Sequence, residues 1–286
     1  MIVDAHYSDY MTMVQQRSIH AVYIATTHNF HFEHIMLCLS HGKHVLCEKP
    51  LTLNAEQAQK AYAIASQHNL LLVEAVWTRF LPAIGALQKV LQEGIIGNVQ
   101  GIQANFSLNR ELPETHRLKN KNLAGGALLD LGIYPITIAD IVFGEEPQSI
   151  QSHHIKASTG VDENSFYTLV YENGAVAQLS AGFKMSGPTF ANIMGDKGLI
   201  SVPFFLGAKS FTVTLEGEEP QDYLYDFDGS NNFTFEIAHV TQILLKGIYN
   251  TDRATDVNTD NNAQFEDVNT RLVSEIMPAD TTLRVM

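Results

Sequence analysis

Short apolar runs alternate with amphipathic stretches along the first hundred residues. Residues 20–26, 44–47 and 70–74 are apolar runs of strand length, whereas residues 30–41 and 55–68 carry apolar side chains at helical spacing. Strands and helices that alternate with short links are typical of a parallel sheet with right-handed crossover connections. The pattern therefore predicts an α/β unit in this part of the chain.

The pattern changes near residue 98. Glu172-Asn173-Gly174 lies between two alternating runs and predicts a β-hairpin. The other alternating runs have the length and composition of strands, and two apolar-periodic stretches have those of helices. The strands are expected over 99–108, 150–157, 165–171, 175–182, 199–202 and 211–215, and the helices over 127–143 and 233–245.

Two domains follow from these patterns. Residues 1–97 are expected to form a partial, truncated Rossmann-like parallel sheet, and residues 98–286 an α+β domain with a large, mostly antiparallel open sheet. Residues 247–270 are rich in Asn, Asp and Thr, which predicts a solvated polar insertion. Within it, residues 256–267 echo a calcium-binding loop but lack its glycine and its final glutamate, so a polar loop is favoured.

Charge and cysteine content limit the possible partners and compartment. The net charge of −13 argues against nucleic acid or an anionic membrane surface as a partner. No run of 18 apolar residues and no signal peptide are recognisable, which predicts no membrane association. Cys38 and Cys47 show neither metal nor disulfide spacing, so a cytoplasmic protein is expected.

Glu48-Lys49-Pro50 follows an apolar strand and is the most informative segment of the chain. A lysine is rarely placed at the end of a buried strand unless its charge is used. Ligands of open α/β sheets bind at the carboxyl ends of the strands, so Lys49 is expected to hold a substrate hydroxyl or carbonyl oxygen. The alternative is a surface lysine in front of a turn.

A second candidate segment begins at Gly125-Gly126 and contains Asp130 and Tyr134. The spacing of four places both side chains on one face of a helix. A tyrosine is a credible general acid or base when a nearby lysine lowers its pKa. The alternative is a capped helix with a half-buried tyrosine.

Two further polar segments follow predicted strands. The turn that contains Thr26, His28 and His31 could meet a cofactor at a helix N-terminus, or could simply cap that helix. The histidines from 28 to 34 do not share one helix face, so no metal site is predicted. Trp77 and Arg79 could line a pocket or form an aromatic hinge between domains.

Together these segments resemble one family, the Gfo/Idh/MocA oxidoreductases, and within it the dihydrodiol-dehydrogenase-like branch. A tyrosine at position 134, where many relatives have histidine, favours this branch. The matching stretches are 21–26, 37–39, 42–54, 74–80, 125–135 and 236–240.

This resemblance implies an oxidoreductase that uses NAD or NADP at a CH–OH or carbonyl group of a small polyol, sugar or cyclic diol. It implies catalytic roles for Lys49, Asp130 and Tyr134, and a homo-oligomer formed through the open sheet. It also implies that the cofactor is bordered by Thr26, His28, His31, Glu48, Lys49, Trp77 and Arg79.

The chain departs from the family pattern at both ends. Its first glycine is Gly42, so no glycine-rich phosphate loop precedes Lys49, and the closing tail of the family is also missing. This predicts a truncated member with weak or undetectable dinucleotide binding. The alternative to an active oxidoreductase is therefore a non-catalytic protein that retains the fold.

Overall fold

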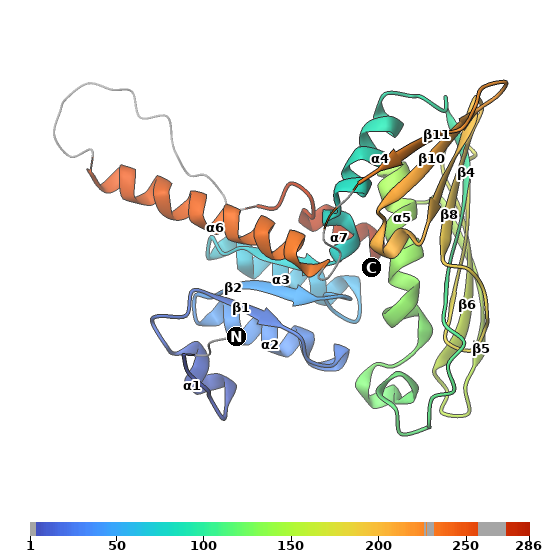
Figure 1. The fold of residues 1–286 in the computed structure, drawn as a ribbon. Coiled ribbons are helices and arrows are strands. Elements are labelled where there is room, and N and C mark those ends of the chain that lie inside the picture. The colour runs from blue at the N-terminus through green and yellow to red at the C-terminus, as the bar shows by residue number, and fades with distance from the viewer. Residues whose placement is uncertain (1–3, 226, 228–231, 257–272) are drawn as a thin grey trace.

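The computed structural model describes residues 4–225, 227, 232–256 and 273–286. Two sheets organise the molecule, a three-stranded one and an eight-stranded one. They lie side by side, with helices between them (Figure 1). The predicted fold class, a parallel Rossmann-like sheet followed by a large and mostly antiparallel sheet, is confirmed.

The small sheet has the order β1-β2-β3, and both strand pairs are parallel. The helix predicted over 55–68 starts at Ala55, and the Asn54 side chain caps it by accepting the Gln57 N–H at 3.0 Å. The helix predicted over 30–41 starts two residues earlier, at His28. A short helix, α1, precedes the sheet. The elements are α1 (Tyr10–Val14), β1 (Ala21–Ile24), α2 (His28–Ser40), β2 (His44–Glu48), α3 (Ala55–Gln67) and β3 (Leu72–Ala75).

The large sheet has the order β11-β10-β9-β8-β4-β7-β6-β5. Only β4 and β7 pair in parallel, and the predicted hairpin at 172–174 joins β6 to β7. Two strands, β8 and β11, were not predicted, because each is a short run with little apolar alternation. The strands are β4 (Val99–Ser107), β5 (Ser149–Lys156), β6 (Asp162–Val170), β7 (Val176–Gly182), β8 (Phe190–Gly195), β9 (Gly198–Pro203), β10 (Ser210–Leu215) and β11 (Gln221–Leu224).

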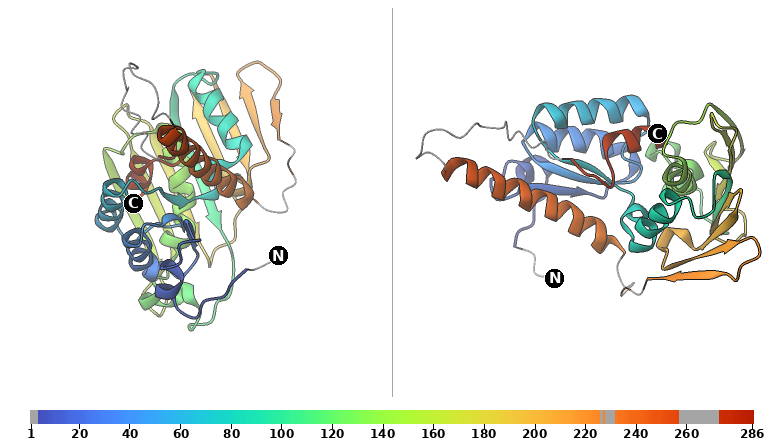
Figure 2. Two further views of the ribbon diagram at one scale, coloured as in Figure 1. Left: turned by 90° about the vertical axis from the view of Figure 1, so that its left-hand side faces the viewer. Right: turned by 90° about the horizontal axis from the view of Figure 1, so that it is seen from above.

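One face of the large sheet is covered by α4 (Pro82–Gln92) and α5 (Ile133–Phe143), and these helices separate it from the small sheet (Figure 1). No helix of the described residues covers the opposite face, as Figure 1 and the right-hand view of Figure 2 show. Assembly of a homo-oligomer through this open face stays a prediction. The helix predicted over 127–143 begins as a π-helical turn, Leu128–Gly132, and continues as α5.

The C-terminal elements return to the small sheet. Helix α6 (Phe233–Asp256) packs on the 3₁₀ helix Trp77–Phe80, and α7 (Ala279–Val285) packs on α3 and α5. The division of the chain at residue 97 therefore stays a prediction. The prediction of a loop over 247–270 is wrong for the residues up to Asp256, because α6 continues through these polar residues. The rest of that loop, with most of the calcium-like spacing, lies outside the described residues.

One helical stretch of the described residues, 121–143, is long and apolar enough to cross a membrane by composition. Most of it is buried within the protein, as expected of a core helix. Cys38 and Cys47 are both buried and free. A cytoplasmic location stays a prediction.

Candidate functional site

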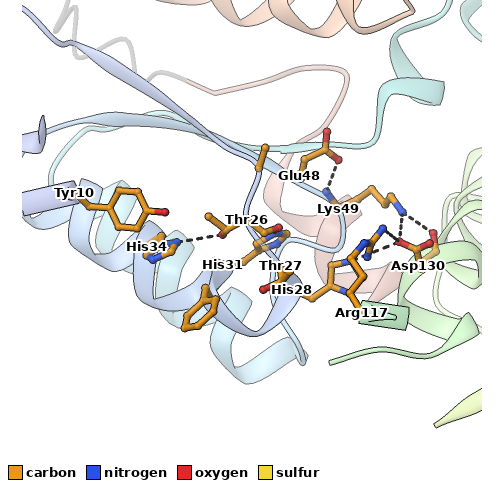
Figure 3. A pocket seen from close by; sticks show the side chains of 12 residues that line it. Tyr10, Thr26, Thr27, His28, His31, His34, Glu48, Lys49, Arg117 and Asp130 are labelled. Carbon is orange, nitrogen blue, oxygen red and sulfur yellow. Dashed lines mark hydrogen bonds and ion pairs between the residues drawn. The ribbon is translucent and has the colours of Figure 1, made fainter. Parts of the chain in front are cut away.

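A pocket of about 670 Å³ opens at the carboxyl ends of β1 and β2, beside the first turn of α2 (Figure 3). This is the place where ligands bind in open α/β sheets. Six of the predicted site residues line it: Thr26, His28, His31, Glu48, Lys49 and Asp130. The remaining lining residues are Tyr10, Ala25, Thr27, Phe30, His34 and Arg117.

Lys49 is the central cation of this pocket. Its Nζ donates to the backbone oxygen of Asp130 at 2.5 Å and lies 3.4 Å from the Oδ1 of the same residue. The ammonium also lies 4.8 Å from the ring centroid of Tyr134, within cation–π range. Burial lowers the pKa of Lys49, and the charges of Asp130 and Glu48 oppose this shift.

One carboxylate oxygen of Asp130 lies close to two cationic side chains and one histidine ring. Its Oδ1 lies 3.2 Å from Arg117, 3.4 Å from Lys49 and 3.7 Å from the Nε2 of His28. Burial alone would raise the pKa of Asp130, but these neighbours together lower it, so the residue is ionised at neutral pH. Asp130 lies within the π-helical turn, a feature frequent at functional sites.

Tyr134 lies next to Lys49 but does not line the pocket. Its hydroxyl accepts the indole N–H of Trp77 at 2.8 Å, and its ring packs edge-on against Phe106. The side chain is buried, and burial raises its pKa well above the ordinary value. The resting site therefore holds a neutral phenol, and Trp77 orients it from behind the pocket.

The two histidines of the polar turn, His28 and His31, form hydrogen bonds to backbone oxygens around the pocket. The ring nitrogens of His31 lie 2.8 Å from the Pro50 oxygen and 3.1 Å from the Thr26 oxygen, which ties the end of β1 to the turn after β2. The Nδ1 of His28 lies 3.1 Å from the Ala124 oxygen, and burial lowers the pKa of His28 to about 4. His28 is therefore neutral at physiological pH.

Arg79 lies away from the pocket lining. It forms a buried ion pair with Asp140, and Arg284 binds the other oxygen of the same carboxylate at 2.6 Å. The structure therefore gives Arg79 a packing role between the two sheets. Its predicted role at the cofactor has no support in this placement.

Arg117 is a charged residue among the six pocket residues that the sequence did not predict. It begins a short 3₁₀ helix, Arg117–Lys119, in a segment of mixed charge where neither periodicity nor a strand end marks it. Its side chain is half exposed at the pocket mouth, and it reaches Asp130 only because the chain folds back over 13 residues. A basic residue shortly before Gly125-Gly126 was the one available signal.

The pocket fits the nicotinamide and ribose end of a dinucleotide. The Thr26 hydroxyl and the Lys49 and Arg117 donors face the cavity, and no side chain caps the first turn of α2. Phe30 and Ala25 add apolar wall. No glycine-rich loop for the pyrophosphate occurs among residues 4–97, where Gly42 forms the turn into β2.

Metal binding has no comparable support in the structure. Among the described residues, no group of three or more His, Cys, Asp or Glu side chains is arranged to hold a metal ion. The predicted lack of a metal stays a prediction.

Comparison with known proteins agrees with this geometry. Residues 2–75 match the oxidoreductase family with an NAD-binding Rossmann fold, and residues 84–201 match the GFO/IDH/MocA C-terminal domain. The trans-1,2-dihydrobenzene-1,2-diol dehydrogenase of Xenopus tropicalis is 34% identical over 248 residues, which cover 85% of this chain and 74% of that protein. The chain belongs to the Gfo/Idh/MocA family. The human protein of the same name is 33% identical over 253 residues, with the same coverage.

Solved structures show the same fold. An aldose–aldose oxidoreductase from Caulobacter crescentus, complexed with glycerol, superposes with a TM-score of 0.80 at 21% identity and covers 98% of this chain and 77% of its own. A 3-ketoreductase from Actinomadura kijaniata, complexed with NADP and TDP-benzene, superposes with a TM-score of 0.77 at 22% identity, covering 98% and 79%. This chain is thus an NAD(P)-binding oxidoreductase of the Gfo/Idh/MocA family, and the comparisons give no support to the alternative of an inactive member.

Proposed function

We propose that this protein transfers a hydride between a nicotinamide cofactor and the CH–OH or carbonyl carbon of a small cyclic diol, polyol or sugar. The observation that carries the proposal is the Lys49 ammonium, whose side chain is 11% exposed and which Asp130 holds between the pocket and the ring of Tyr134. The names of the relatives support the substrate class, since curated proteins that are 34% and 33% identical to this chain are named as dehydrogenases of a cyclic vicinal diol.

Lys49 binds the reacting oxygen in this proposal. Its positive charge stabilises the negative charge that develops on a substrate oxygen as a hydroxyl loses its proton. Asp130 keeps the lysine charged and aimed, because it opposes the effect of burial on the lysine pKa. His28 and Arg117 hold Asp130 from its other sides. When bound, the nicotinamide supplies the hydride acceptor or donor.

Tyr134 is the proposed proton carrier. As a neutral phenol it already carries the proton that the substrate oxygen at Lys49 takes up when a carbonyl is reduced, so its resting state suits the reduction direction. In the oxidation direction it must first lose a proton, which burial disfavours and the nearby lysine charge assists. The Trp77 N–H stabilises the phenolate by donating to its oxygen.

The proposal is tested with the purified protein, NAD⁺ or NADP⁺, and a panel of cyclic diols, polyols and aldoses, followed by the absorbance of the reduced nicotinamide. Reduction of the matching ketones in the opposite direction completes the test. We expect turnover with at least one cyclic vicinal diol. Dinucleotide binding without turnover of any hydroxyl or carbonyl compound in the panel would contradict the proposed function.

Tyr134→Phe is expected to lower turnover by about 10²- to 10⁴-fold, because it keeps the ring but removes the proton carrier. KM is expected to change less than kcat, since Tyr134 does not line the pocket. The measurement is steady-state kinetics in both directions.

Tyr171→Phe is the matched control for Tyr134→Phe, because Tyr171 is also a buried tyrosine but packs on Phe143, away from the pocket. Thermal unfolding is compared as well, because Tyr134→Phe leaves the Trp77 N–H without its acceptor, at a cost of about 1–3 kcal/mol. Turnover within about twofold of the parent protein would remove Tyr134 from the catalytic role.

A further inference from the structure

Glu236 is a buried carboxyl group without a hydrogen-bond partner among the described residues. It lies on the first turn of α6 and is 0% exposed. No described residue donates a hydrogen bond to either of its carboxyl oxygens. An unpartnered ionised carboxylate at such a site is costly, so a group of this kind takes up a proton or serves a function.

The face of α6 that carries Glu236 points at the back of the proposed catalytic site. One turn before it, Phe233 packs against Trp77 with a ring centroid distance of 6.0 Å. One turn after it, Val240 joins the apolar cluster around Leu46 at the centre of β2. Trp77 in turn holds the hydroxyl of Tyr134. Glu236 therefore lies in the layer directly behind the tyrosine and the end of β2.

The charged and titratable groups around Glu236 come from three other elements. Glu48, at the end of β2, accepts a hydrogen bond from the Tyr23 hydroxyl of β1 and lies 3.3 Å from the Lys49 backbone N–H. Burial, the larger cause, and the charge of Glu48 together raise the pKa of Glu236 to about 8. Glu236 contributes in the same sense to the raised pKa values of Tyr134 and Tyr23, although burial is the largest cause for both.

We propose that Glu236 is a positioning residue that holds one proton beside Glu48, so that the Lys49–Tyr134 site faces a single carboxylate charge from this side. The inference rests on the proposed function for its catalytic meaning. A second negative charge behind the site would oppose the loss of a proton from Tyr134 and weaken the stabilisation of a substrate oxyanion by Lys49. The proton on Glu236 keeps that charge absent at neutral pH.

Trp77 provides a test that needs neither substrate nor cofactor. It is the only tryptophan of the chain, and it contacts both Phe233 and Tyr134. Its fluorescence is titrated from about pH 5 to about pH 10. We expect a transition with a midpoint near pH 8 in the parent protein, as Glu236 ionises.

Four variants assign this transition. Glu236→Gln keeps the shape of the side chain without the titrating group, and it is expected to abolish the transition. Tyr134→Phe is expected to retain it, as is the control Glu218→Gln, which changes an exposed glutamate in a turn of the large sheet. Glu48→Gln removes the neighbouring charge and is expected to lower the midpoint. The midpoint measured for Glu48→Gln tests the proposal even if Glu236→Gln folds poorly.

A parent protein with no transition in this range would overturn the proposal. So would a transition that persists in Glu236→Gln, or a midpoint that Glu48→Gln leaves unchanged. Because these readouts need no turnover, loss of the proposed oxidoreductase function would leave them intact. In the active enzyme, Glu236→Gln is expected to remove the alkaline step of the kcat/KM profile near pH 8.

Protein stability gives an independent measurement of the same proton. The pKa of Glu236 is higher in the folded state than in the unfolded chain, so its stability contribution is lost as pH rises from about 4.5 to about 8. Glu236→Gln lacks this loss. Its melting temperature, relative to that of the parent protein, is therefore expected to rise across that window, and equal pH dependence of the two proteins would contradict the assignment.

Discussion

Lys49→Met is expected to lower turnover of the best diol or ketone substrate by about 10²- to 10⁴-fold, and Lys49→Arg to restore little of it. Methionine fills a similar volume but removes the charge that stabilises the substrate oxygen. Arginine keeps the charge but has a planar head that does not fit the 2.5 Å contact with the Asp130 oxygen. The measurement is kcat/KM in both directions, with cofactor binding followed separately by calorimetry.

The control for this expectation is Lys89→Met, which removes an exposed lysine of α4 that is paired only with Glu93. It is expected to leave turnover and stability unchanged, because exposed pairs of this kind contribute little. Loss of turnover in Lys49→Met together with complete loss of folding would point to a structural lysine instead. Turnover close to that of the parent protein would exclude Lys49 from the reaction.

Arg79→Met is expected to have the largest effect on stability, a loss of about 3–5 kcal/mol in the free energy of unfolding. The Arg79–Asp140 ion pair is buried, with side chains 5% and 6% exposed. Removing the arginine leaves the buried carboxylate with Arg284, whose side chain is 23% exposed, as its remaining ionic partner. Urea denaturation of the parent protein and the variant measures the difference.

Two comparisons separate this packing role from the predicted cofactor role of Arg79. Arg284→Met removes the more exposed partner of the same carboxylate, and a smaller loss of stability is expected. If Arg79 serves packing alone, the folded Arg79→Met protein binds dinucleotide as the parent protein does. Unchanged stability with weakened dinucleotide binding would instead support the role predicted from sequence.

Local sequence patterns predicted most of the fold. The alternation of strands and helices before residue 75 and the hairpin at 172–174 depend on neighbours in sequence, and the structure confirms both. The prediction failed where a preceding helix, and not the local composition, decides the secondary structure. Residues 247–256 are polar, yet they continue α6, because extending an existing helix costs less than starting one.

Within the candidate site, the residue types at the strand ends were enough to place Lys49 and the polar turn at one pocket. The spacing of Asp130 and Tyr134 was enough to place them on one helix face, but not to place them beside Lys49, which lies 81 residues before Asp130. It could not show that Tyr134 turns its hydroxyl toward Trp77, since Trp77 lies 57 residues earlier in the chain.

The sequence by itself determined the parallel sheet, the pocket at its carboxyl edge and the lysine in that pocket, because each follows from local periodicity and from the place where a strand ends. Only the tertiary structure decided which side chains contact one another. Lys49 meets Asp130 across 81 residues, and Glu74 meets Thr282 across 208. No local pattern encodes contacts between residues so far apart in the chain. The packing role of Arg79 and the burial of the Glu236 carboxyl group without a described partner therefore depend on how distant segments pack together and exclude water.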